Sequence, residues 1–279
     1  MCGRYAASAN PDELIEAFEV EVDATAERSR SLLVKPQEPP PGEPDYNMAP
    51  SKQAPVVLER RPRDDPDEDA PPARQLRLLT WGLVPSWAKD PSVGARMINA
   101  RAESLLEKPA FTKAALRRRC LVPARGWYEW QASPVATDAR GRPRKQPFFI
   151  TRADQPLLAF AGIYEFWRDP TVDPEAPDAW VVSYSIVTTS AEPGLDRVHD
   201  RQPLVLDPDQ WADWLDPRLT DPDDVRTLIQ PHDPGRFVAW PVSRAVNSTG
   251  NNGPALLEPV RVEDLEGVVD PMTGEVIGG

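Results

Sequence analysis

The second residue of the chain is a cysteine, in the opening MCGR. Removal of Met1 would give Cys2 a free α-amine and a thiol on adjacent carbons. An α-amine has a pKa near 8, so about a tenth is neutral at pH 7, against roughly a thousandth or less for a lysine. Such an amine attacks aldehydes, and the thiol can then close on the imine to form a thiazolidine. Alternatively, the amine is the base for a thiol nucleophile, or Cys2 is incidental, because many chains begin with Met and a small residue.

A second candidate group is the segment Asn99-Ala-Arg-Ala-Glu103. An asparagine amide can orient an amine or a carbonyl. Arg96 and Arg101 flank Asn99, and the planar guanidinium fork suits a phosphate. The alternative is a helix start with solvated charges.

The carboxylate of Glu129 lies between Tyr128 and Trp130 in the segment 117–130. Aromatic neighbours remove water from a carboxylate, which raises its pKa towards the range of a general acid or base. The alternative is a surface glutamate at the end of a strand.

A histidine occupies the segment RVHDRQPLVL: His199, with Arg197 and Arg201 two residues away on either side and Asp200 next to it. A histidine in such a setting suits a proton shuttle or a phosphate donor. The alternative is a histidine in a turn. His232, the other histidine, has only a loop context and is not a candidate.

Two tryptophans, Trp81 and Trp87, lie in the segment TWGLVPSWA. Together they could form a stacking wall for nucleobases. Either could equally belong to the core, because most of the nine tryptophans must be packed inside.

Short apolar or β-branched runs, each bounded by Pro, Gly or Asp, dominate the chain. Helices are expected over 11–19, with Asn10 as the cap, over 101–118 with an interruption, and over 207–215. Because strands and helices do not alternate regularly, we predict an α+β fold, a single domain whose mainly antiparallel β-strands form a curled sheet or barrel-like core with a few flanking helices. The expected strands are 54–58, 76–84, 119–123, 148–151, 157–163, 181–189 and 236–243.

The composition sets limits on function. The net charge of −12 argues against a general nucleic-acid binder, although a local basic cleft is compatible with it. Part of the acidic excess lies in the proline-rich segment 59–74, which we expect to be mobile. Two cysteines argue against a disulfide framework, and two cysteines and two histidines without finger-like spacing argue against a structural zinc site. No signal peptide or membrane span is evident, so a cytoplasmic protein is expected.

Nine motifs stand in an order that resembles one known family, the SOS response-associated peptidases (SRAP), or abasic-site processing proteins. The resemblance covers residues 2–257, with polar or proline-rich insertions near 22–44, 59–76 and 131–146, and leaves 258–279 as a C-terminal tail. Gln202 stands where methionine is expected. The motifs are MCGRYA, YNMAPSKQAPVV, WGLVPSWA, INARAES, CLVPARGWYEW, FAGIYEFW, IVTTSA, HDRQPLVL and VNSTGNNGP.

The resemblance implies that Cys2, freed of Met1, forms a thiazolidine crosslink with the ring-opened aldehyde of an abasic site in single-stranded DNA. It implies that Asn99 holds the Cys2 amine or the crosslink, that Glu129 is the acid or base of Schiff-base formation, and that His199 helps to open the deoxyribose. The residues expected to bind DNA are Arg4, Asn47, Pro50, Trp81, Arg96, Arg101, Trp130 and Arg201.

No cofactor or metal is expected, and a monomer is the default. The partner implied is single-stranded DNA with abasic sites, so the protein would be nucleoid-associated when bound. Two other functions stay open: a thiol peptidase that uses Cys2, with Glu129 or His199 as base, and a non-covalent single-strand binding module.

Overall fold

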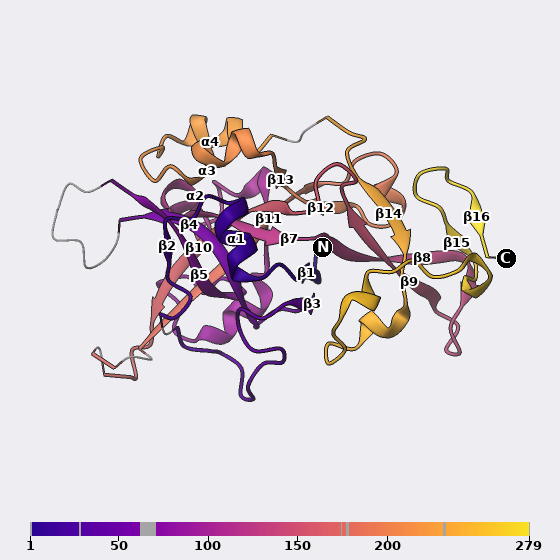
Figure 1. Ribbon diagram of the computed structural model, residues 1–279, viewed down its shortest axis with the longest axis horizontal. Helices are drawn as coiled ribbons and strands as arrows, with labels where there is room; N and C mark the ends of the chain where they lie inside the picture. The colour runs from indigo at the N-terminus through magenta and orange to yellow at the C-terminus, as the bar shows by residue number, and fades with distance from the viewer. Residues whose placement is uncertain are drawn as a thin grey trace.

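A computed structural model describes residues 2–27, 29–61, 71–173, 175–176, 179–230 and 233–278 (Figure 1). Three features of the sequence lie outside these residues: Met1, whose removal is predicted, most of the acidic segment 59–74, and His232.

A ring of five strands forms the centre of the molecule. Neighbouring strands pair antiparallel from β11 through β10, β7 and β4 to β5, and β5 then pairs with β11 in parallel, with Thr80 opposite Ser183. This last pairing closes the barrel, so the predicted barrel-like core is confirmed. The five strands are β4 (Gln53–Arg60), β5 (Ala73–Trp81), β7 (Arg119–Ala124), β10 (Leu158–Arg168) and β11 (Trp180–Ser190).

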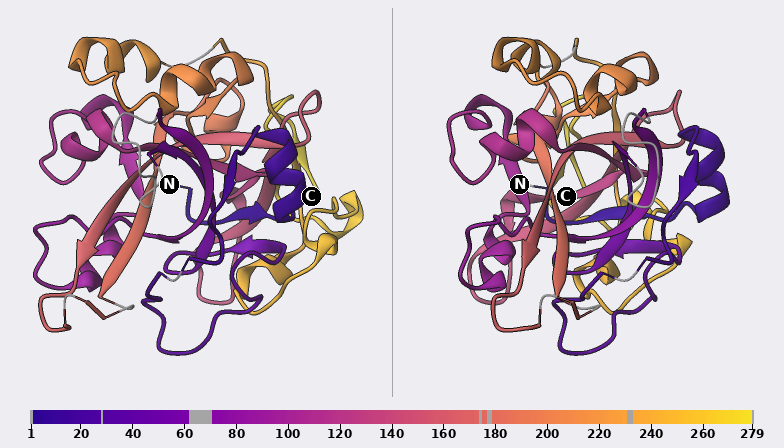
Figure 2. Two further views of the ribbon diagram at one scale, coloured as in Figure 1. Left: turned by 60° about the vertical axis from the view of Figure 1, so that its left-hand side comes forward. Right: turned by 90° about the vertical axis from the view of Figure 1, so that its left-hand side faces the viewer.

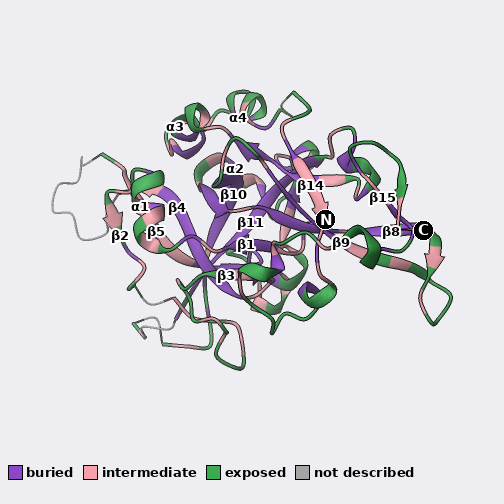
Figure 3. Ribbon diagram, turned by 45° about the vertical axis from the view of Figure 1, so that its right-hand side comes forward, coloured by how far each residue is buried: buried purple, intermediate pink, exposed green. Residues whose placement is uncertain are grey.

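Alternation along these strands makes two apolar faces. On β4, Val56 and Leu58 belong to the cluster inside the barrel, whereas Val57 belongs to the cluster under the helices. Figure 2 shows α3 and α4 along one side of the curved strands, and Figure 3 shows the strands as the most buried part. The helices are α1 (Pro11–Ala17), α2 (Thr112–Arg117), α3 (Trp211–Leu215) and α4 (Pro222–Leu228).

A second sheet lies beside the barrel and contains the N-terminal strand. Its order is β14 (Val238–Pro241), β9 (Pro143–Thr151), β8 (Trp127–Thr137), β1 (Tyr5–Ala7) and β3 (Asp45–Met48). The predicted insertion at 131–146 therefore consists largely of the outer parts of β8 and β9. The insertion at 59–76 likewise includes the end of β4 and the start of β5.

Short elements complete the fold. The strands are β2 (Val22–Asp23), β6 (Asn99–Arg101), β12 (Arg201–Pro203), β13 (Val205–Leu206), β15 (Val268–Val269) and β16 (Val276–Ile277). The 3₁₀ turns are η1 (Pro91–Arg96), η2 (Ala102–Ser104), η3 (Leu195–Arg197), η4 (Pro208–Gln210), η5 (Arg244–Asn247), η6 (Pro254–Leu256) and η7 (Val262–Asp264).

Two expectations for local structure need correction. The predicted helix over 101–118 is reduced to η2 and α2, and the alternative of a helix start at Asn99 is wrong, because β6 pairs with β11 there. The strand predicted over 76–84 ends at Trp81, since Gly82 adopts φ +124°. By contrast, the Asn10 cap is confirmed: its side chain accepts from the backbone N–H of Glu13 at 2.9 Å.

Gly82 is where we expect an alanine to be costly. A Cβ there would lie 2.6 Å from the carbonyl oxygen of Gly94, in a conformation that L-residues avoid. Gly82→Ala should lower the free energy of unfolding by roughly 2 kcal/mol or more. Urea denaturation measures this. Gly250→Ala is the control, because a Cβ there would lie 3.9 Å from Ser248 Oγ, an ordinary contact distance, and an equal loss in both variants would contradict the prediction.

Candidate active site around Cys2

Cys2 is fully buried at the junction of the barrel and the second sheet. Its position follows from β1, where Tyr5 pairs with Met48 of β3 on one side and Trp127 of β8 on the other. The Nδ2 of Asn99 donates a hydrogen bond to the carbonyl oxygen of Cys2 at 2.7 Å. Figure 1 shows the N-terminus in the middle of the molecule, beside these strands.

The other atom of the Asn99 amide, Oδ1, is buried and has no hydrogen-bond partner among the described residues. A buried acceptor without a partner carries a free-energy cost that a nearby donor would relieve. An N–H group formed on Cys2 would be such a donor.

Burial raises the pKa of the Cys2 thiol well above its usual value, and the negative charge of Glu129 adds to the rise. The thiol is therefore protonated at neutral pH. A cysteine that attacks as a ready thiolate needs the opposite environment.

Glu129 lies on β8 with only 3% of its surface exposed, so the alternative of a surface glutamate is wrong. Burial raises the pKa of Glu129 to about 7; the charge of Asp200 adds to the rise and Lys145 opposes it. At that pKa the carboxyl group can both accept and donate a proton near neutral pH.

His199 follows η3, and its ring is partly exposed. Its Nδ1 accepts the backbone N–H of Arg201 at 3.0 Å, so we assign the proton of the neutral ring to Nε2. Asp200 Oδ1 is 2.9 Å from the same Nδ1, a contact that becomes an ion pair only when the ring is protonated. Burial lowers the pKa of His199 against the effect of Asp200, so the ring is mainly neutral at pH 7.

Strand β11 brings the segments of Asn99 and His199 together. On one side Asn99 is opposite Ile186 and Arg101 opposite Thr188; on the other, Ser190 is opposite Arg201. Residues about 100 positions apart in the sequence therefore lie on the two sides of one strand, which periodicity alone does not reveal.

The guanidinium of Arg201 is held by a carboxylate. It binds both oxygens of Glu103, at 2.6 and 2.8 Å, and donates to the Thr188 carbonyl at 2.7 Å. The hydrogen bond from Arg201 lowers the pKa of Glu103. Arg96 and Arg101 are exposed.

Arg4 is fixed by β3 and by the loop that follows β14. It donates to Asn47 Oδ1 at 2.6 Å and to the Val246 carbonyl at 2.8 Å, and its guanidinium lies 5.8 Å from the ring centre of Trp130. Trp130 is partly buried and donates from Nε1 to Asn247 at 2.7 Å.

Asn47 is fully buried and faces the protein rather than solvent. Its Nδ2 bonds the carbonyl oxygens of Val246, Ser248 and Asn251 at 2.9–3.3 Å. The structure therefore gives Asn47 the role of holding Arg4 and the 246–251 loop, rather than a direct contact with DNA. Pro50 is partly exposed, in the turn before β4.

Trp81 is also misplaced by the sequence-based prediction. It is 0% exposed: its ring packs inside the barrel against Tyr5, and its Nε1 donates to the Ile98 carbonyl at 2.9 Å. The structure assigns it to the core, where it supports the residue before Asn99. Trp87, 63% exposed, is the accessible indole of this segment.

Sequence reasoning missed two residues near Glu129. Lys145 is exposed on β9 opposite Ala132, and its positive charge lowers the pKa of both Glu129 and His199. Gln131, also on β8, contacts the loop that carries His199. The basic run before residue 146 was the one available signal for Lys145.

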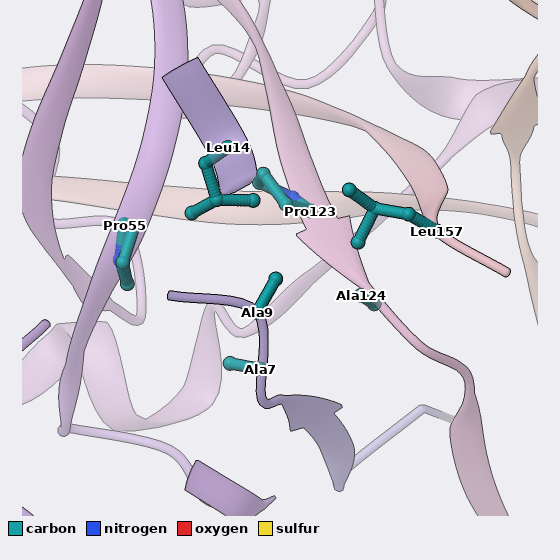
Figure 4. A pocket seen from close by; sticks show the side chains of 7 residues that line it. All are labelled: Ala7, Ala9, Leu14, Pro55, Pro123, Ala124 and Leu157. Atoms are coloured by element: carbon teal, nitrogen blue, oxygen red, sulfur yellow. The ribbon is translucent and has the colours of Figure 1, made fainter. Parts of the chain in front are cut away.

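Other features of the described residues do not suggest a competing site. None of their His, Cys, Asp and Glu side chains gather in groups of three that could hold a metal. A small hollow between α1, β4 and β7 is lined by Ala, Leu and Pro side chains and holds no reactive group (Figure 4). No helix in the described part of the chain is long and apolar enough to cross a membrane.

Three features together define a class of protein. The second residue is a buried cysteine in a barrel, an asparagine binds its carbonyl, and the pKa of a nearby glutamate is close to neutral. The family model "SOS response associated peptidase (SRAP)" matches residues 1–249. The chain belongs to this family.

Three relatives illustrate the similarity. The abasic site processing protein YoqW of Bacillus subtilis (strain 168) is 36% identical, with 92% of this chain and 99% of YoqW covered. The abasic site processing protein HMCES of Pongo abelii is 32% identical over 93% of this chain and 76% of its own. A crystal structure of a Bacteroides thetaiotaomicron protein has a TM-score of 0.71 at 21% identity, covering 93% and 100% of the two chains, and shows the shared fold.

The raised pKa of Glu129 has a consequence for stability. Its folded pKa of about 7 exceeds the unfolded value of roughly 4.3, so the folded state loses stability as pH rises between these values. At pH 8 the free energy of unfolding of Glu129→Gln should therefore exceed that of the parent by roughly 2–4 kcal/mol, measured by urea denaturation. The difference should shrink towards pH 4.

The control is Glu165→Gln. Glu165 is equally buried but forms an ion pair with Arg118 at 2.9 Å, so its loss should destabilise the protein at pH 8. Destabilisation of Glu129→Gln at pH 8 would contradict the assignment.

Proposed function

We propose that this protein processes abasic sites by capturing them covalently in single-stranded DNA through Cys2. The observation that carries the proposal is the contact between Asn99 and Cys2. One atom of the Asn99 amide holds the Cys2 carbonyl, and the other is a buried acceptor without a partner among the described residues, which we assign to the amine that Met1 removal creates. Membership of the SRAP family and relatives named abasic site processing proteins support the substrate.

The reaction begins once Met1 is removed, by hydrolysis of its peptide bond to Cys2. The neutral α-amine attacks the aldehyde carbon of the ring-opened sugar, forming a C–N bond while a proton passes from nitrogen to oxygen. The carbinolamine loses water to give an imine. The Cys2 sulfur then adds to the imine carbon and its proton moves to nitrogen, which closes the thiazolidine. The net loss is one water.

Glu129 suits the proton transfers of this sequence. Its pKa of about 7 lets it take a proton from the attacking amine and return it to the departing hydroxyl. The protonated thiol suits the final step, which needs its proton for the imine nitrogen.

His199 suits the opening of the sugar ring. With its proton on Nε2, the neutral ring can donate to the ring oxygen of the deoxyribose or to a neighbouring phosphate. In this proposal Arg4, Arg96, Arg101 and Arg201 bind the backbone, Pro50 borders the site and Trp130 lies near the bases.

A thiol peptidase that turns over other peptides has less support, because the thiol pKa is raised rather than lowered. Removal of Met1 by the protein itself remains compatible with the crosslinking function. We propose that the protein acts as a cytoplasmic monomer without a metal.

Intact-protein mass after mixing with a single-stranded oligonucleotide that carries one abasic site tests the proposal. The expected product is the protein without Met1 plus the DNA, less one water, and it should survive denaturation. Cys2→Ser should give no stable thiazolidine, whereas Cys120→Ala, which removes the other buried thiol, should retain it. Absence of the adduct from folded parent protein without Met1, or its persistence in Cys2→Ser, would refute covalent capture by Cys2.

The pH dependence of capture reports on Glu129. The amine must be neutral, which favours a pH above about 8, and Glu129 must be protonated for water to leave, which favours a pH below about 7. The rate should therefore follow a bell with its maximum between these values. Glu129→Gln should lower the rate by roughly 10²-fold and remove the alkaline fall. An unchanged alkaline fall in this variant would assign that limb to another group.

A further inference from the structure

A hairpin beyond the family match packs against the strand that carries Glu129. The match ends at residue 249, whereas β15 and β16 pair through Val268–Ile277 and Val269–Val276. Figure 1 shows this hairpin, in yellow, beside β8. Leu265 and Val268 are buried in the same apolar cluster as Cys2, so the hairpin is part of the folded body.

The contact is made by the buried face of β8. Residues 129, 131 and 133 are buried, whereas 130, 132 and 134 are partly or fully exposed, which places the three buried side chains on one face. Ser133 Oγ donates to the Gly267 carbonyl at 2.5 Å. Gln131 Oε1 accepts the N–H of Val269 at 2.8 Å, and its Nε2 donates to the Val269 carbonyl at 2.9 Å.

Gln131 also reaches the loop of His199. Its Nε2 donates a second hydrogen bond, 3.2 Å long, to the carbonyl of Arg197, two residues before His199. Arg197 in turn donates to the Pro271 carbonyl of the hairpin at 2.6 Å. Gly194, the residue just before η3, leaves room for the hairpin, because a Cβ there would lie 3.0 Å from the same Pro271 oxygen.

We propose that Gln131 and the C-terminal hairpin together are the device that positions His199 relative to Glu129. The side-chain amide lies between three segments: β8, the hairpin and the His199 loop. An apolar side chain at 131 would remove the hydrogen bonds to the N–H of Val269 and to the carbonyls of Val269 and Arg197. The His199 loop would then have no hydrogen bond to β8 through this residue. This inference gives the existing site a positioning residue and rests on the proposed function only for its kinetic part.

The variant that tests the proposal is Gln131→Leu, which keeps an uncharged side chain of similar size. Gln146→Leu is the matched control: it lies directly opposite on β9 and donates to the carbonyls of Pro147 and Val242, away from the hairpin and the His199 loop. Ser133→Ala is the second test variant, since it weakens the hairpin contact without touching Gln131. Thermal unfolding establishes that each variant is folded.

The first measurement does not depend on DNA. In a His232→Gln background, His199 is the one remaining histidine, so its ring Cε1–H signal can be followed by NMR as pH changes. The groups whose charges act on this ring include Asp200 and Lys145, and none of the variants alters them. Release of the loop should move the titration midpoint of His199 up towards the ordinary value in Gln131→Leu, and less far in Ser133→Ala. Gln146→Leu should match the parent.

The second measurement is the rate of covalent capture at increasing DNA concentration. Gln131→Leu should lower the rate at saturation by about tenfold, because catalytic groups are misplaced. The concentration giving half the maximal rate should not change, since the arginines are untouched. The control Gln146→Leu should change neither the rate at saturation nor the concentration that gives half the maximal rate.

An unchanged His199 titration in both Gln131→Leu and Ser133→Ala would overturn the proposal, as would an equal shift in Gln146→Leu. If Gln131→Leu does not fold, Ser133→Ala decides. If the parent forms no adduct, the proposed function fails, while the titration still decides whether the hairpin positions His199.

Discussion

The placement of the chain's second residue inside the protein is the constraint on which the site depends. Cys2 lies in the dry junction between barrel and second sheet because β1 pairs with both β3 and β8. Its carbonyl is held by Asn99, which reaches this point only because β6 pairs with β11. The pairing of β5 with β11, which closes the barrel, thus fixes the strands against which the N-terminus packs.

Removal of water from this junction also sets the protonation of the reactive groups. Burial is the largest cause of the shifted pKa in Cys2, Glu129 and His199 alike. The result is a protonated thiol, a carboxyl group that titrates near neutrality and a largely neutral imidazole. One physical effect therefore keeps uncharged forms available, which suits a sequence of steps in which protons are passed back and forth.

Much of the fold and part of the site can be predicted from local patterns. Apolar runs bounded by turn residues locate most barrel strands, and the aromatic neighbours of Glu129 indicate its desolvation. The family resemblance led us to expect Trp81 and Asn47 at the DNA, although both are buried. Sequence does not reveal which side of a strand faces inward when both flanks are apolar, so it could not correct this expectation. The β15–β16 hairpin consists of two-residue strands whose stability comes from packing on β8, and such long-range support leaves little local signal.

The ion pair between Arg201 and Glu103 has a consequence for how DNA is selected. A phosphate that binds Arg201 must take the place of a carboxylate already bound through two oxygens. Binding there is an exchange of one anion for another, so its net gain is small in the absence of other contacts. Together with an overall charge of −12, this makes intact strands weak competitors, and under the proposed function lasting retention then comes from the covalent step at Cys2.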